Sequence, residues 1–171
     1  MTAPPTAAAL QRLARHCGRE LMRRELRLVA AESCTGGLIA ATCTAIAGSS
    51  DWFDGAFVTY RESVKTRALD VAEVTLARYG AVSEPTVREM AVGALTHCDA
   101  DLAVSVSGVA GPSGGRVESP VGTVWFGWAL RVPDGIRIVQ TSCHQLRGNR
   151  NQIRRAAVGV ALEGVLATLE P

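Results

Sequence analysis

The chain has 171 residues, a length typical of one compact domain, and we expect a single domain over residues 1–171. Hydrophobic residues make up 47% of the chain and charged residues 20%, so a sizeable core can form. The 18 basic and 16 acidic side chains nearly balance, which argues against bulk electrostatic binding of nucleic acid.

The first half of the chain alternates helical and strand patterns. Apolar residues at helical spacing open the chain, and short apolar runs bounded by glycine follow them. The predicted elements are, in order, helix 7–24, strand 26–33, helix 37–48, strand 55–60 and helices 61–71 and 74–80.

The second half continues the alternation and then changes character. Ser83 is a plausible N-cap, with Pro85 in the first turn of the helix that it begins. The expected elements are helix 83–98, a strand from 101 that runs into a Gly-rich loop, two strands within 120–146 joined by a Pro-Asp-Gly turn, and a last helix from Asn149. This order predicts a three-layer α/β/α sandwich with a mixed, mostly parallel sheet and a late antiparallel hairpin.

Three loops that follow strand ends are candidate site loops, because sites in such sheets form at the carboxyl ends of strands. The first reads "ESCTGG" over residues 32–37. A strand that enters a helix through two glycines leaves backbone N–H groups free, and these favour an anion or a developing oxyanion. The alternative is a tight turn in which Gly36 and Gly37 only permit close packing. No Walker or Rossmann motif is present.

The second candidate loop reads "VTYRESVK" over residues 58–65, with Tyr60 and Lys65 in it, and it is taken together with the earlier segment "GSSDW". A serine becomes a good nucleophile when a base takes its proton, and Lys65 is the available base in this part of the chain. Lys65 can act only when neutral, so its pKa must fall from about 10.4 towards about 7–8. The alternatives are a solvated helix lysine and, for Tyr60, an aromatic residue at the edge of the core.

The third candidate, "SGVAGPSGG" over residues 107–115, offers bare backbone for the close approach of a ligand, or is a flexible connection. The basic run 147–155 is either a solvated helix face or an anion clamp. Five cysteines with wide spacings and no C-x-x-C predict neither a disulfide framework nor a metal site, and indicate a reduced, cytoplasmic protein. No apolar run is long enough to span a membrane, and we expect no signal peptide.

With these motifs, the sequence resembles the CinA C-terminal domain family of nicotinamide-nucleotide amidohydrolases. The matching words are "AESCTGG", "AGSSDWFDGAFVTY", "GAVSEPTVREMAVGAL", "SVSGVAGPSGG" and "PVGTVWFGWA", followed by "GNRNQIRRAA". The resemblance implies hydrolysis of the carboxamide of nicotinamide mononucleotide (NMN) to nicotinate mononucleotide and ammonia, in pyridine nucleotide salvage. Amide hydrolysis of this kind needs no cofactor, and we expect none. The chain begins close to its first helix and therefore resembles the stand-alone form of the family.

The resemblance also implies roles for individual residues. Ser50 is the expected nucleophile and Lys65 the base, with Tyr60 assisting. Ser33 at the strand-to-helix elbow remains a rival nucleophile, and Cys34 is a weaker rival because no His lies near it in the sequence. The residues expected to bind substrate are Ser33, Cys34, Thr35, Gly36, Ser107, Gly108, Ala110 and Gly111, with Arg150 on the phosphate.

Two further expectations concern function and assembly. The alternative function is a non-catalytic module that binds a nucleotide or a partner, linked to competence or DNA damage. We also expect a homo-oligomer, with a dimer favoured, because the apolar segment "VGTVWFGWAL" is either an interface or core.

Overall fold

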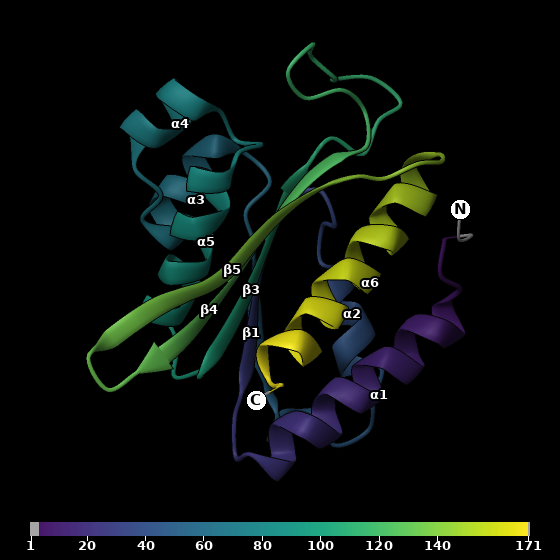
Figure 1. Ribbon diagram of the computed structural model, residues 1–171, viewed down its shortest axis with the longest axis vertical. Helices are drawn as coiled ribbons and strands as arrows, with labels where there is room; N and C mark the ends of the chain where they lie inside the picture. Colours follow the sequence, from purple (N-terminus) through teal and green to yellow (C-terminus); the bar gives the residue numbers. More distant parts are fainter. Residues whose placement is uncertain (1–3, 171) are drawn as a thin grey trace.

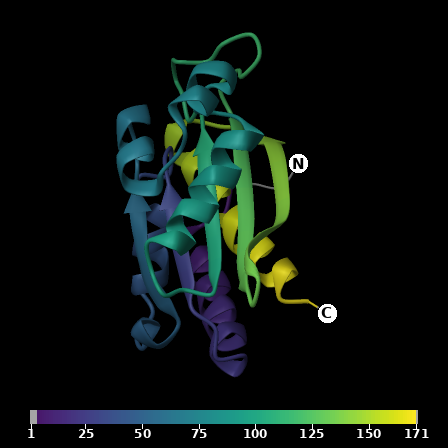
Figure 2. The ribbon, with the colours of Figure 1, turned by 90° about the vertical axis from the view of Figure 1, so that its left-hand side faces the viewer.

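A five-stranded sheet lies between two layers of helices in the computed structural model, which describes residues 4–170 (Figure 1). Helices α3, α4 and α5 cover one face of the sheet, and α1, α2 and α6 cover the other (Figures 1 and 2). The elements are α1 (Ala7–Arg23), β1 (Leu28–Glu32), α2 (Leu38–Thr44), the 3₁₀ turn η1 (Ser49–Asp51), β2 (Phe53–Val58), α3 (Glu62–Leu69), α4 (Glu73–Tyr79), α5 (Glu84–Thr96), β3 (Leu102–Gly108), β4 (Thr123–Val132), β5 (Gly135–Gln145) and α6 (Arg150–Thr168).

The strand order is β2-β1-β3-β4-β5. The first three strands are parallel, whereas β3 with β4 and β4 with β5 are antiparallel pairs. The predicted three-layer sandwich with a late hairpin is therefore confirmed. The three parallel strands end at one edge of the sheet, where loop 109–122 rises above the strands in Figure 1 and α6 begins. We call this edge the carboxyl edge.

Strand alternation divides the core into two clusters, one on each face of the sheet. Along β1, Leu28 and Ala30 pack with α1, α2 and α6, whereas Val29 and Ala31 pack with the helices of the other layer. Phe126 and Trp128 of β4 stack and are buried in the first cluster, and the indole of Trp128 donates to the carbonyl of Ala161 at 3.0 Å. Phe126 and Trp128 of the apolar hairpin segment are thus core, whereas Trp125 of the same segment is only partly buried.

Side chains define several helix ends. Asn149 caps α6 through a reciprocal capping box with Gln152, and Ser83 caps α5 as predicted. Helix α2 is shorter than the expected helix 37–48: it ends at Thr44, and the chain then continues to the η1 turn.

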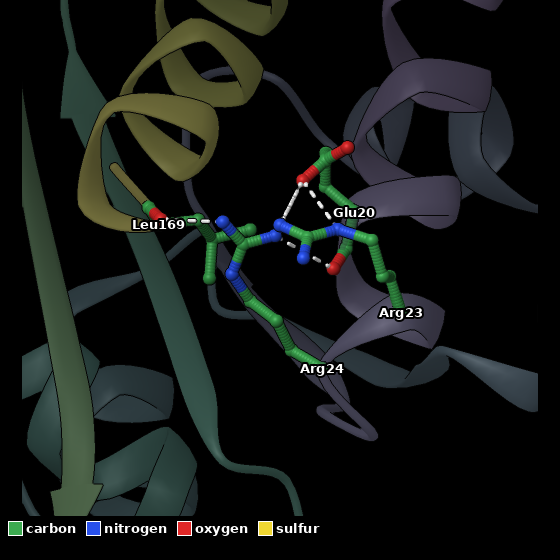
Figure 3. Close-up of polar contacts among 4 residues, drawn as sticks. All are labelled: Glu20, Arg23, Arg24 and Leu169. Atoms are coloured by element: carbon green, nitrogen blue, oxygen red, sulfur yellow. Dashed lines mark hydrogen bonds and ion pairs between the residues drawn. The ribbon is translucent and has the colours of Figure 1, made fainter. Parts of the chain in front are cut away.

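Arg24 connects the C-terminal ends of α1 and α6 (Figure 3). Its guanidinium donates to the carbonyl of Leu169 at 2.8 Å and also pairs with Glu20, which Arg23 contacts at 3.1 Å. Because α6 begins at the carboxyl edge, this contact anchors the opposite end of the helix.

No helix within residues 4–170 has the length and apolar character required to cross a membrane. Within the same range no cluster of His, Cys, Asp and Glu could hold a metal ion. The five cysteines are unpaired.

Candidate active site

Ser33 and Lys65 meet at the carboxyl edge of the sheet. Ser33 follows the last residue of β1, and its N–H donates to the carbonyl of Val106 in the neighbouring β3 at 3.0 Å. It continues the alternation of Val29 and Ala31, so its hydroxyl faces the layer that contains α3. The amine Nζ of Lys65 lies 2.9 Å from Ser33 Oγ. The structure thus pairs the expected base with the serine of the elbow.

Lys65 is fully buried, although it stands on the second turn of a short helix. Its Nζ lies 2.6 Å from the carbonyl oxygen of Thr59 and 3.4 Å from that of Tyr60. Burial lowers the pKa of Lys65 from 10.5 to about 8, although the nearby Cys34 and Glu62 oppose the shift. Two carbonyls can only accept, whereas a hydroxyl can donate or accept, so the three partners suit a neutral amine with two N–H groups and one lone pair.

Glu32 was missed by the sequence analysis and dominates the N-terminus of α2. Its carboxylate is fully buried and accepts from the backbone N–H groups of Gly37 at 3.0 Å, Ile39 at 3.1 Å and Ala40 at 2.9 Å. The chain therefore supplies its own anion to the helix end at which we expected a ligand anion. An acidic residue four positions before a pair of glycines that leads into a helix is the signal that could have indicated this cap.

Several backbone N–H groups of the elbow between Ser33 and α2 are already paired. The N–H of Gly36 donates to the carbonyl of Ser33, and that of Leu38 to the carbonyl of Thr35. Among residues 4–170, no acceptor is found for the N–H of Thr35. The Thr35 hydroxyl is also buried without a partner among the described residues, and Arg154 of α6 donates to the Thr35 carbonyl at 2.7 Å.

Cys34 lies between the two hydroxyl residues of the elbow and is 5% exposed. Burial raises the pKa of its thiol to about 11, although Lys65 nearby opposes the shift. A thiol with this pKa holds its proton at neutral pH, which disfavours Cys34 as the nucleophile.

Tyr60 and Arg150 form a contact between two of the loops at the carboxyl edge. Arg150, the first residue of α6, donates to the phenol oxygen of Tyr60 at 2.9 Å and to the carbonyl of Gly111 at 2.7 Å. Tyr60 is 60% exposed, and it is the carbonyl of Tyr60 that contacts Lys65. The arginine thus joins the loop after β2 to the Gly-rich loop after β3.

The other expected residues of the Gly-rich loop have structural contacts. Ser107 is buried, and its hydroxyl donates to the carbonyl of Ala81 at 2.6 Å. Gly108 packs so closely on β4 that a Cβ would lie 2.6 Å from the carbonyl oxygen of Thr123. Ala110 is buried in the cluster beneath α6. These residues fix the loop against the sheet.

Ser50 lies apart from Lys65. It belongs to η1, before the first residue of β2, whereas Lys65 follows the last residue of that strand. Because β2 has 6 residues and a strand rises about 3.3 Å per residue, its two ends are roughly 20 Å apart. Ser50 is exposed at the edge where the parallel strands begin, so the structure does not form the expected pair of Ser50 and Lys65.

Two of the grooves formed by residues 4–170 differ in their relation to the site. The larger, of about 880 Å³, lies between α1 and α6 and contains none of the predicted site residues. The smaller, of about 570 Å³, lies at the carboxyl edge between α4, the turn at residues 80–82 and loop 109–122. Its lining includes Glu62, one helical turn before Lys65, and Val109, just after β3. The smaller groove therefore reaches the start of α3 and the end of β3, although neither Ser33 nor Lys65 lines it.

Comparison with known proteins shows that most of the chain matches one protein family. A model of the CinA C-terminal domain matches residues 10–169. The nicotinamide-nucleotide amidohydrolase PncC of Escherichia coli K12 is 48% identical over 158 residues, which cover 92% of this chain and 93% of that protein. A CinA-like protein of Akkermansia muciniphila is 47% identical over 85% of this chain, but the match covers only 34% of that longer protein.

Solved structures show the same architecture. A CinA superfamily protein from Klebsiella pneumoniae superposes with a TM-score of 0.87 at 38% identity, covering 94% of this chain and 97% of that one. The competence/damage inducible protein CihA from Agrobacterium tumefaciens gives a TM-score of 0.86 at 41% identity, covering 99% of this chain and 100% of that one.

Proposed function

Because the chain belongs to the CinA C-terminal domain family, we propose that it hydrolyses the carboxamide of NMN to nicotinate mononucleotide and ammonia, in pyridine nucleotide salvage. The chain is an amidohydrolase, as the near full-length match to PncC of E. coli indicates. The single observation that supports the proposed chemistry is the buried contact of 2.9 Å between Lys65 Nζ and Ser33 Oγ.

The first half of the proposed reaction acylates Ser33. Neutral Lys65 takes the hydroxyl proton as Ser33 Oγ bonds to the carboxamide carbon. The negative oxygen of the tetrahedral intermediate lies against the elbow, where the N–H of Thr35 is available as a donor. The C–N bond then breaks, and the nitrogen leaves as ammonia with the proton that Lys65 returns to it. Ser33 is left as an ester of nicotinate mononucleotide.

The second half regenerates the enzyme. Lys65, neutral again, takes a proton from a water molecule that attacks the ester carbon. The intermediate collapses as Lys65 returns the proton to Ser33 Oγ, which releases nicotinate mononucleotide. Ser33 thus replaces Ser50 as the proposed nucleophile, and Tyr60 acts by holding Arg150 over the site instead of assisting the base. Cys34, Thr35 and Gly36 line the elbow.

Ammonia release from NMN by the purified protein tests this proposal. We expect Ser33→Ala and Lys65→Ala each to reduce kcat at least 1,000-fold, because each removes either the nucleophile or the base of a pair that acts together. Ser50→Ala is the matched control, with a kcat within about 2-fold of the unsubstituted protein, because Ser50 lies at the other edge of the sheet.

Three outcomes would contradict the assignment. A loss of activity in Ser50→Ala, with activity retained in Ser33→Ala, would return the nucleophile to Ser50. No ammonia from folded protein would favour the alternative of a module that binds a nucleotide without turnover. Unchanged turnover in Lys65→Ala would show that Lys65 is not the base.

Sedimentation of the same preparation tests the expected dimer.

A further inference from the structure

The groove at the carboxyl edge lies on the same side of the sheet as the hydroxyl of Ser33. Ser33 faces the layer of α3, α4 and α5, where Lys65 contacts it. The groove is formed by α4, by the turn at residues 80–82 and by loop 109–122. These segments lie at the carboxyl edge, on the side of the sheet that α3, α4 and α5 cover. A carboxamide placed at Ser33 therefore leaves the rest of its molecule room to extend into this space.

The volume of the groove and the chemistry of its lining suit a sugar phosphate. At about 570 Å³ it falls within the usual range for small-molecule sites. Arg78 and Arg116 line it, and so do Glu62 and Glu118. Guanidinium groups bind phosphate oxygens, whereas carboxylates accept hydrogen bonds from the hydroxyls of a ribose. A ligand that carries both a phosphate and a diol matches this mixture of charges.

Arg150 is less suited to be the main phosphate ligand. Two of its N–H groups already contact the phenol of Tyr60 and the carbonyl of Gly111. It also comes from α6, in the layer that covers the opposite face of the sheet (Figure 1). These contacts give it the role of a bridge between two loops, with its remaining donors at the mouth of the site.

The arginines of the groove are differently placed. Arg116 stands in loop 109–122, where paired backbone bonds between Arg116 and Ser119 close a tight turn. The guanidinium of Arg78 lies 5.1 Å from the ring centre of its neighbour Tyr79. Both side chains are exposed on the groove, so a bound anion can reach them without displacing a core contact.

We infer that this groove is the subsite for the ribose phosphate of the substrate, with Arg116 and Arg78 on the phosphate and Glu62 and Glu118 on the ribose hydroxyls. The inference rests on the proposed function, since it takes NMN as the substrate. It makes the two arginines specificity-determining residues that favour a phosphorylated nucleotide over the nucleoside without phosphate.

Two measurements on the whole protein test the subsite. The first compares kcat/KM for NMN with kcat/KM for nicotinamide riboside, which lacks the phosphate. We expect Arg116→Ala to reduce this ratio about 10- to 100-fold, mainly through the KM for NMN, because a charge-assisted contact is lost. Arg78→Ala should act in the same direction. Arg137→Ala is the matched control, since Arg137 is an exposed arginine near the start of β5, at the end of the sheet opposite the carboxyl edge.

The second measurement is direct binding of ribose 5-phosphate, with ribose as the comparison, by calorimetry. It needs no amide hydrolysis, so it separates the subsite from the proposed reaction. Binding that is weakened at least 10-fold in Arg116→Ala supports the subsite even if the protein releases no ammonia.

Opposite results would overturn the inference. One is that ribose 5-phosphate binds no more tightly than ribose. Another is that Arg150→Ala alone abolishes the preference for NMN while Arg116→Ala and Arg78→Ala retain it. A third is an equal loss with both substrates in the groove variants, which would indicate a general effect on the loops.

Discussion

The environment of Lys65 explains how an amine can act as a base near neutral pH. Its side chain is buried, with oxygen atoms of Ser33, Thr59 and Tyr60 around the nitrogen. No carboxylate pairs with Lys65 among residues 4–170, so desolvation dominates and favours the neutral form. Lys65 thus has a substantial neutral fraction at mildly alkaline pH.

We predict that kcat/KM rises with pH and has its midpoint at about 8. The pKa of Lys65 is lowered to about 8, and only the deprotonated amine can take the proton of Ser33. Initial rates of ammonia release between pH 6 and pH 10 measure the profile. A rate that falls over pH 6 to 8, or that is flat through pH 8, would rule Lys65 out as the base.

At the scale of elements, the site depends on how α3 packs against α5. Leu69 ends α3 one turn after Lys65, and α5 approaches it at Gly93. A Cβ at Gly93 would lie 1.9 Å from the carbonyl oxygen of Leu69, so only glycine permits this approach. The position of Lys65 is therefore set by a backbone contact between two helices.

Replacing glycine by alanine in two helices should have opposite effects. We predict that Gly93→Ala lowers the free energy of unfolding by about 1–3 kcal/mol and also lowers kcat, because α3 must move. Gly159→Ala in α6 meets only ordinary contacts, at 3.5 Å from Pro5, and should raise the free energy of unfolding by about 0.5–1 kcal/mol. Denaturant unfolding and kcat of both variants check this, and a Gly93→Ala protein of full stability and activity would contradict it.

At the scale of the whole molecule, a buried base affects stability. The pKa of Lys65 is about 8 in the folded protein, below its ordinary value of 10.5, so between these two values the unfolded chain binds more protons. The free energy of unfolding therefore rises with pH across this window, and the cost of burying the ammonium is fully present below pH 8.

We predict that Lys65 alone contributes a rise of about 3 kcal/mol in the free energy of unfolding between pH 8 and pH 10.5. Lys65→Met provides the comparison, because it retains the other groups that titrate in this range. Denaturant unfolding of both proteins at several pH values measures the difference in slope. Parallel curves would show that Lys65 has an ordinary pKa.

The architecture could be predicted from the sequence because periodicity reports it directly. The helix at Ser83 and the late hairpin follow from local patterns of apolar and turn residues. The convergence of Ser33 and Lys65 also follows from topology, since both come after parallel strands. The same rule places Ser50, which precedes β2, at the opposite edge, and the resemblance alone did not reveal that.

Other parts of the site depend on three-dimensional contacts that no short pattern encodes. Lys65 is buried with its amine against the oxygens of Ser33, Thr59 and Tyr60 in two separate loops, and the bridge from Arg150 to Tyr60 joins residues 90 positions apart in the chain. The groove arises from three segments that meet only in the fold. Sequence patterns give the loops of the site, but tertiary packing decides which side chains meet in it.

The carboxylate of Glu32 at the start of α2 has a consequence for inhibitor design. A compound that carries a permanent anion towards this helix end would be repelled, because an acidic group already occupies the donors there. A boronic acid is neutral on entry and becomes anionic only after it bonds to a serine. Warheads of that kind, attached to a pyridine ring, suit this pocket better than carboxylate mimics of the product.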